Sequence, residues 1–272
     1  MIVNEIILEV KNLTKKYQLP NEKFLTACNE ISFQVEAGKT IGIVGESGSG
    51  KSTLVKMLMG MESVTAGEVY FRKQNILNLN KQALWKLRPQ IQMVFQSPVA
   101  SLHPKMKIID IVTEPLFNYK RLKRSEKLAK AKELLAMVEL SEEFLNRYPH
   151  SLSGGQCQRV SIARALALKP AILICDEATS ALDVSVQKNI VDLLLKLQAE
   201  QKMSILFICH DLALVHSFAH KILVMEKGVL VDELSEGESL TESTEEYTQA
   251  LVDSVFSLKE IKRNLQINNA RK

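Results

Sequence analysis

A glycine-rich loop in the first quarter of the chain carries residue types that bind phosphate. It reads Gly45-Glu46-Ser47-Gly48-Ser49-Gly50-Lys51-Ser52 and fits the pattern G-x-x-x-x-G-K-[ST]. The glycines allow the backbone to curl so that successive N–H groups converge on phosphate oxygens, and a helix starting near Lys51 adds the positive end of its dipole. We expect Lys51 to reach the β- and γ-phosphates, the Ser52 hydroxyl to ligate Mg²⁺, and Thr53 to support the phosphate contacts. The loop therefore predicts nucleotide binding.

Two carboxylates end a short apolar segment in the second half of the chain. Asp176 and Glu177 directly follow Ile172–Cys175, and open α/β sheets bind ligands at the carboxyl ends of their strands. Asp176 is then placed to hold Mg²⁺, directly or through water. Glu177 lies one residue further and points elsewhere, so it can polarise a water against the γ-phosphate. A turn cap is the structural alternative, and the presence of the phosphate loop favours the catalytic interpretation.

Single polar residues stand at the ends of two further apolar segments. Gln96 follows residues 91–95, and His210 follows residues 205–209. Either residue alone would be an ordinary surface group. Two of them, on separate strand ends of one sheet, favour a role beside the phosphate.

Alternating strands and helices must position these residues. We expect strands over 6–17, 30–45, 69–71, 91–95, 172–175, 205–209, 222–225 and 229–231, and helices over 50–60, 156–168, 184–201 and 212–220. Residues 40–45 form an apolar run that suits a strand buried on both faces, and residues 36–39 are expected to form a hairpin turn. This alternation implies an α/β fold with a mostly parallel sheet between two layers of helices.

Residues 97–152 have a different character from the rest of the chain. Seven basic residues against one acid lie within 120–132, and Leu128, Leu134, Leu135 and Val138 supply an apolar face. The pattern predicts a small helical subdomain with a basic exposed side. Such a helix can bind nucleic acid or an anionic membrane, although a solvated helix face is the simpler interpretation.

Composition excludes several classes of protein. The chain has 272 residues, 46% of them hydrophobic, and its 35 basic and 31 acidic residues give a net charge of only +4. It is too apolar to be disordered, and no apolar run exceeds five residues, so we expect neither a spanning helix nor a signal peptide. The four cysteines form no Cys-x-x-Cys pair, which favours reduced packing thiols in a cytosolic protein.

A further motif carries a family resemblance. Ser151-Leu152-Ser153-Gly154-Gly155-Gln156 strongly resembles the signature of ATP-binding cassette (ABC) ATPases. The other motifs follow in that family's order: the phosphate loop, Gln96, the signature, Asp176-Glu177, Ser180-Ala181-Leu182-Asp183 and His210. The resemblance spans residues 6–258. It implies an ATPase that uses ATP and Mg²⁺ and a P-loop NTPase three-layer α/β core with an antiparallel β subdomain and an inserted helical subdomain.

The resemblance also implies domain boundaries. Residues 1–96 would form the first part of the nucleotide-binding core with the antiparallel β subdomain, and 97–155 the helical subdomain ending in the signature. Residues 156–231 would complete the core, and 232–272 would be a C-terminal extension.

Several roles around one ATP follow from the same resemblance. Tyr17 resembles the aromatic residue that stacks on adenine. Gln96 resembles the residue that touches Mg²⁺ and the attacking water. Glu177 resembles the catalytic base, and His210 resembles the switch residue that bonds the γ-phosphate.

Other residues resemble those that act across a dimer of ATPases. The signature residues that would reach the γ-phosphate of ATP held by the opposite subunit are Ser153, Gly154, Gly155 and Gln156. A helix N-terminus at the two glycines favours such an anion. Asp183 would lie in the loop that crosses the dimer interface. A single copy would therefore not complete its own catalytic site.

Three stretches are similar to the ATPases of dipeptide, oligopeptide and nickel importers. They are residues 96–106, 176–185 and 247–251; the chain departs from that pattern at His103-Pro104-Lys105 and at Glu245-Glu246. The similarity implies that the chain powers the uptake of a peptide, or of nickel or a metal chelate. It also implies that the chain lies peripherally at the cytoplasmic face of the cell membrane. The implied partners are a second ATPase (a sibling or a second copy), two transmembrane permeases and, indirectly, an extracytoplasmic solute-binding protein.

Two other functions stay open. One is the ATPase of an ABC exporter. The other is a soluble ABC ATPase acting on nucleic acid, which we do not expect because the net charge is small and the 56 residues between Gln96 and Ser153 leave no room for a coiled-coil insertion.

Overall fold

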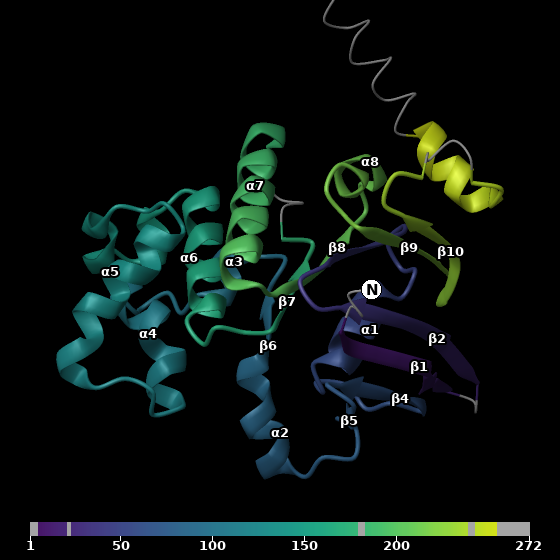
Figure 1. Cartoon of the computed structure of the whole chain (residues 1–272), viewed down its shortest axis with the longest axis horizontal. Coiled ribbons are helices and arrows are strands. Elements are labelled where there is room, and N and C mark those ends of the chain that lie inside the picture. Colours follow the sequence, from purple (N-terminus) through teal and green to yellow (C-terminus); the bar gives the residue numbers. More distant parts are fainter. Residues whose placement is uncertain (1–4, 21–22, 179–182, 239–242, 255–272) are drawn as a thin grey trace, which may run out of the picture. The chain divides into compact units, whose positions relative to one another are not determined.

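The computed structural model describes residues 5–20, 23–178, 183–238 and 243–254, so Ser180-Ala181-Leu182 of the family motif and the last residues of the resemblance over 6–258 lie outside it. Figure 1 shows the ribbon of the chain, which divides into two compact units. Unit 1 comprises Glu36–Lys39 and Asn78–Leu206 with the N-terminal residues through Ile6. Unit 2 comprises Ile7–Val35, Thr40–Leu77 and the chain from Phe207 onward. The four-part domain division stays a prediction.

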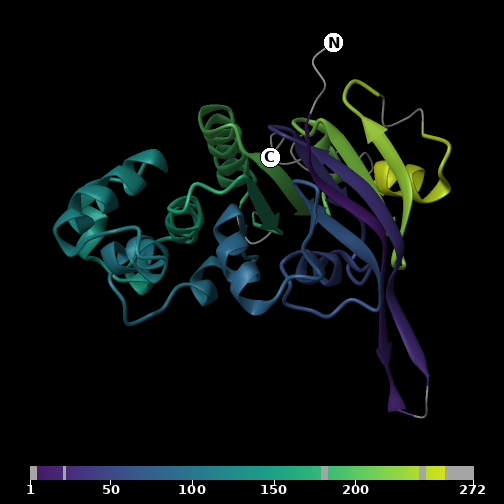
Figure 2. The ribbon, with the colours of Figure 1, turned by 60° about the horizontal axis from the view of Figure 1, so that its bottom comes forward.

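An antiparallel sheet forms one part of unit 2. Its strand order is β2-β1-β4-β5, formed by β1 (Ile6–Gln18), β2 (Phe24–Glu36), β4 (Ala66–Phe71) and β5 (Gln74–Asn75). Strand β1 pairs with β4 antiparallel, with Leu8 opposite Phe71. Figure 2 shows β1 and β2 as the two long arms of a hairpin.

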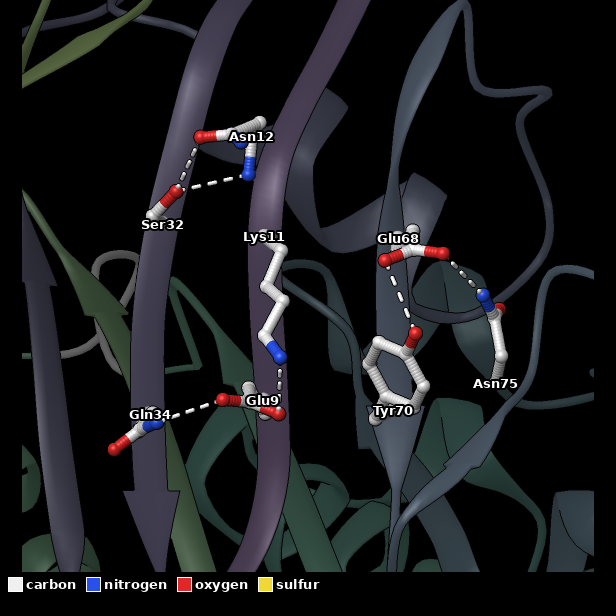
Figure 3. A network of polar contacts seen from close by, with 8 residues as sticks. All are labelled: Glu9, Lys11, Asn12, Ser32, Gln34, Glu68, Tyr70 and Asn75. Carbon is white, nitrogen blue, oxygen red and sulfur yellow. Dashed lines mark hydrogen bonds and ion pairs between the residues drawn. The ribbon is translucent and has the colours of Figure 1, made fainter.

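Polar pairs cover the exposed face of this sheet (Figure 3). Glu9 accepts from Gln34 at 2.8 Å and pairs with Lys11 at 3.1 Å, and that ammonium group lowers the pKa of the Glu9 carboxyl. On the neighbouring strand, Tyr70 donates to Glu68 at 3.0 Å. This face is solvated, as expected of an antiparallel sheet with one buried side.

The second sheet of unit 2 is built on β3 (Thr40–Val44), which is buried at every residue. Beyond it lie β9 (Lys221–Glu226) and β10 (Val229–Ser235), in the order β10-β9-β3, and β8 (Ser204–Cys209) is the next neighbour of β3. Strands β3 and β9 are parallel. The helices of this unit are α1 (Lys51–Leu58), α8 (Leu212–His216) and one over residues 246–254.

The hairpin turn predicted at residues 36–39 is wrong. Strand β2 pairs within the antiparallel sheet, whereas β3 joins the other sheet. The reason is burial: β2 alternates exposed and buried residues near its end, but β3 is apolar on both faces and needs a sheet covered on both sides.

Unit 1 is mainly helical around two parallel strands, β6 (Ile91–Val94) and β7 (Ile172–Asp176). The first three residues of β8 also belong to it. Its α-helices are α2 (Lys81–Leu87), α3 (Pro98–Ser101), α4 (Ile108–Asn118), α5 (Lys127–Met137), α6 (Gly154–Leu166) and α7 (Val184–Gln201). Short 3₁₀ turns occur at Arg88–Gln90, Arg124–Glu126, Glu142–Asn146 and Pro149–Ser151. The α/β class predicted from the sequence is confirmed.

Helix α5 corrects one detail of the predicted apolar face. Leu134, Leu135 and Val138 are buried as expected, together with Ala131, but Leu128 is 53% exposed. Leu128 shares the face by spacing, yet it lies in the first helical turn, beyond the residues that pack on this face.

Three of the seven basic residues in 120–132 form ion pairs with neighbouring acids. Lys127 pairs with Asp110, Lys130 with Glu133 and Lys132 with Glu142. These pairs favour the solvated helix face, which was the simpler interpretation. Within the described ranges, no helix has both the length and the apolar character needed to cross a membrane.

Candidate functional site

The phosphate loop (Gly45–Ser52) connects the end of β3 to the start of α1. Lys51 is the first residue of the helix, and its side chain is curled inside the loop with only 5% of its surface exposed. Its Nζ donates to the carbonyl oxygens of Gly45 at 2.6 Å and Glu46 at 2.7 Å. The cation therefore lies in the loop that would receive a polyphosphate.

Two glycines of the loop are required by its backbone path. Gly45 has φ 151° and Gly50 has φ 105°, and a Cβ atom would meet the carbonyl oxygen of Met225 at 2.1 Å in the first case and that of Ala27 at 2.4 Å in the second. Neither contact can be relieved by rotating a side chain. These positions hold the curled backbone of the loop, and in such a loop N–H groups can form an anion-binding concavity.

The start of α1 supplies the remaining groups of the predicted phosphate site. Ser52 is exposed and Thr53 is half-buried, both in the first turn. The four first N–H groups of a helix have no partner within the helix, so this turn favours an anion.

Glu177 and Gln96 are brought together in unit 1 by parallel strands. Val94 lies opposite Cys175 in the β6–β7 register, and the two site residues follow these positions by two residues each. The Gln96 side chain donates from Nε2 to Glu177 Oε2 at 2.5 Å. Glu177 has φ 45°, an uncommon backbone conformation that occurs preferentially at functional sites.

The signature residues begin helix α6. Ser153 Oγ accepts from the Gln156 N–H at 3.3 Å, and Gln156 Oε1 accepts from the Ser153 N–H at 2.9 Å, which together form a capping box. Gly155 lies close to α7, because a Cβ there would come within 2.9 Å of Val186. The helix N-terminus and its two glycines remain at or near the surface.

This capping box gives a testable stability prediction. Ser153→Ala should lower the free energy of unfolding by about 1 kcal/mol, because one side-chain acceptor at the start of α6 is lost. Denaturant unfolding measures the change. Ser153→Thr, which keeps an acceptor hydroxyl, is the matched control and should lose less. Equal stability of the wild type and Ser153→Ala would contradict the cap.

The other predicted site residues have definite places. Asp176 is the last residue of β7, and Asp183 is the N-cap of α7, where it accepts from Val186 N at 3.0 Å. The Ser185 hydroxyl, at 2.7 Å, is the main cause of a lowered pKa of Asp183. Tyr17, near the end of β1, lies under the ammonium group of Lys15. His210 follows β8 and is exposed.

The predicted residues fall into two sets. Unit 1 carries Gln96, Ser153, Gly154, Gly155, Gln156, Asp176, Glu177 and Asp183, and unit 2 carries the phosphate loop, Thr53, Tyr17 and His210. One contact of the loop was missed by sequence reasoning: Tyr247 accepts from the N–H of Glu46 at 2.9 Å. The two residues are 201 positions apart, and no spacing signal could have joined them.

The four cysteines are buried thiols. Burial raises the pKa of Cys28 to about 11 and that of Cys175 to about 12. Both thiols stay protonated at neutral pH and are therefore poor nucleophiles, as expected of packing residues.

Comparison with known proteins gives consistent matches. The family described as "ABC transporter" matches residues 28–180. The oligopeptide transport ATP-binding protein OppF of Haemophilus influenzae is 40% identical over 260 residues, which cover 92% of this chain and 78% of that protein. A second relative, from Sinorhizobium fredii, is described as a probable peptide ABC transporter ATP-binding protein. It is 44% identical over 257 residues, which cover 92% of this chain and 72% of that protein.

Solved structures agree with the sequence matches. The ATP-binding cassette MJ0796, solved as a dimer in a post-hydrolysis state with ADP and phosphate, has a TM-score of 0.77 and 34% identity. That match covers 85% of this chain and 100% of MJ0796. CbiO1 of Clostridium perfringens, part of an ABC transporter complex, has a TM-score of 0.76 and 27% identity, covering 97% of this chain and 95% of its own. The P-loop fold predicted for the chain is therefore confirmed.

Proposed function

We propose that this chain, which belongs to the ABC transporter family, powers the uptake of peptides through partner permeases. As a member of that family it is an ATPase whose hydrolysis of ATP is coupled to transport. The observation that carries the peptide assignment is the similarity, over 92% of the chain, to two proteins named for oligopeptide or peptide transport. It favours peptides over nickel or a metal chelate, which the motifs alone left open.

In this proposal the phosphate loop holds ATP. Its backbone N–H groups and the start of α1 bind the phosphates, with Thr53 in support. Lys51 exchanges the carbonyl oxygens of Gly45 and Glu46 for the β- and γ-phosphate oxygens, to which a cation binds more strongly. Tyr17 stacks on the adenine.

The oxygen donors of Ser52, Gln96 and Asp176 suit Mg²⁺, which prefers hydroxyl, amide and carboxylate oxygens. Gln96 supports this fit because it donates to Glu177 through Nε2, which leaves its amide oxygen as the atom able to bind a cation. Bound Mg²⁺ would neutralise part of the phosphate charge.

Hydrolysis requires a positioned water and stabilisation of charge on the γ-phosphate. Glu177 polarises the water, and the hydrogen bond from Gln96 holds the Glu177 carboxylate in place. His210 bonds the γ-phosphate. The opposite subunit supplies its signature residues, Ser153 to Gln156, whose backbone opens a helix toward the anion, and Asp183 lies at the shared interface.

The partners follow from the need of each ATP site for signature residues of a second subunit. A second ATPase subunit, a sibling or another copy of this chain, closes over the two ATP molecules. Two transmembrane permeases then carry the solute delivered by an extracytoplasmic solute-binding protein. The chain would lie peripherally at the cytoplasmic face of the membrane.

The other candidate functions have less support. Three of the seven basic residues in 120–132 are paired with acids, which weakens the case for nucleic-acid binding. An exporter would require permeases of a different kind, and the relatives named for peptide or oligopeptide transport do not favour it.

Uptake in cells tests the substrate. Deleting the gene should abolish accumulation of a labelled oligopeptide while uptake of labelled nickel continues, and restoring the wild-type chain should recover peptide uptake. A chain carrying Lys51→Ala, expressed at the same level, should fail to restore it because the loop cation is lost. Unchanged peptide uptake together with lost nickel uptake would contradict the peptide assignment.

A further inference from the structure

The phosphate loop is contacted by a segment from the far end of the chain. This C-terminal segment, residues 243–254, contains the helix over 246–254 beside β10 (Figure 1). From it, the phenol oxygen of Tyr247 accepts a hydrogen bond from the backbone N–H of Glu46 at 2.9 Å. The contact is made at the second residue of the loop.

That bond and one bond of Lys51 hold the same peptide group. The peptide that joins Gly45 to Glu46 offers its N–H to Tyr247 on one side and its C=O to Lys51 Nζ at 2.6 Å on the other. A planar peptide group held at both ends cannot rotate about its neighbouring bonds. The orientation of this peptide sets the direction in which the rest of the loop curls.

The segment that carries Tyr247 is firmly docked. Asp232 of β10 accepts from the hydroxyls of Thr248 at 2.8 Å and Ser243 at 2.6 Å. Thr248 is fully buried, and Leu251 and Val252 are buried with it. Asp232 lies where the register of β10 against β9 shifts. Tyr247 is therefore presented to the loop from a helix with its own polar and apolar anchors.

We propose that Tyr247 is a positioning residue for nucleotide binding, which fixes the first peptide of the phosphate loop through its hydroxyl group. The inference rests on the proposed role of this loop in holding the phosphates of ATP. When Lys51 turns to the phosphates it releases the Gly45 carbonyl, and Tyr247 then holds the peptide without it. The hydroxyl thus matters more with nucleotide bound than without it.

The alternative is a packing residue whose hydroxyl group merely finds a partner, as buried tyrosines commonly do. If Tyr247 only packs, its replacement by phenylalanine leaves nucleotide binding unchanged. If Tyr247 positions the loop, the same replacement weakens nucleotide binding, because the Glu46 N–H loses its acceptor while the ring and its contacts remain.

Tyr247→Phe in the full chain separates these roles. The dissociation constant of ADP with Mg²⁺, measured by calorimetry, should rise about 2- to 10-fold, the value of one neutral hydrogen bond. The Michaelis constant for ATP should rise by the same factor with kcat within twofold. Hydrogen exchange at the Glu46 amide should accelerate, while the melting temperature changes little.

Tyr70→Phe is the matched control. Tyr70 also uses its hydroxyl group, donating to Glu68 at 3.0 Å in the antiparallel sheet of the same unit. Its removal should leave ADP binding and Glu46 exchange as in the wild type. An equal effect of the two substitutions would overturn the proposal, because the effect would then not be specific to the loop.

Two failures are distinguishable. If the wild type binds ADP and Tyr247→Phe binds it equally well with unchanged Glu46 exchange, the positioning role is wrong and the proposed function stands. If the wild type does not bind ADP, or Lys51→Ala binds it as well as the wild type, the role of the loop itself is wrong.

Discussion

Glu177→Gln should abolish steady-state ATP hydrolysis while leaving ATP binding nearly unchanged. Removal of a positioned general base costs about 10²- to 10⁴-fold in rate. The substitution preserves the shape of the side chain, and the introduced amide oxygen can still accept from Gln96 Nε2, as the carboxylate does at 2.5 Å. The base is therefore removed without releasing Gln96. The measurements are kcat at saturating ATP with Mg²⁺ and the dissociation constant of ATP.

The control for this prediction is Glu139→Gln in the same unit. Glu139 is a half-exposed acid that pairs with Arg159 at 3.0 Å and Lys196 at 3.3 Å, and these bonds lower its pKa. Removing its charge should leave kcat within twofold of the wild type. A kcat for Glu177→Gln within tenfold of the wild type would remove Glu177 from the role of base.

The meeting of Gln96 and Glu177 could be predicted because it follows from local rules. Each residue ends an apolar segment, and the carboxyl ends of parallel neighbouring strands meet at one edge of a sheet. In the observed register Val94 pairs with Cys175, and Gln96 and Glu177 each follow two residues later. Periodicity also located helix α7, which was expected over 184–201 and spans Val184–Gln201.

Prediction failed where the decisive contact was not local. The first half of β2 was missed because its apolar residues do not alternate with polar ones. Phe24 and Leu25 are adjacent, and both are exposed, at 64% and 53% of their surface. The turn at residues 36–39 was misjudged because a turn signal does not reveal which sheet receives the next strand. Tyr247 and Glu46 meet only through the docking of a distant helix on Asp232.

Gly50→Ala should eliminate nucleotide binding and destabilise the fold. At φ 105° an alanine is strained by about 1–3 kcal/mol. Its Cβ would also meet the Ala27 carbonyl oxygen at 2.4 Å, a backbone atom held within β2. The loop must therefore move away from the strand.

Movement of the loop removes phosphate contacts. Hydrogen bonds to charged groups are worth about 1.5–3 kcal/mol each, so the loss of two weakens ADP binding by about 100-fold or more. The matched control is Gly237→Ala, where φ is 88° and nothing lies within 4 Å of the added atom. It should carry the backbone strain alone, which lowers the melting temperature but leaves ADP binding intact. If both variants bind ADP like the wild type, then close approach to Ala27 does not determine the shape of the loop, and the glycine serves only local backbone freedom.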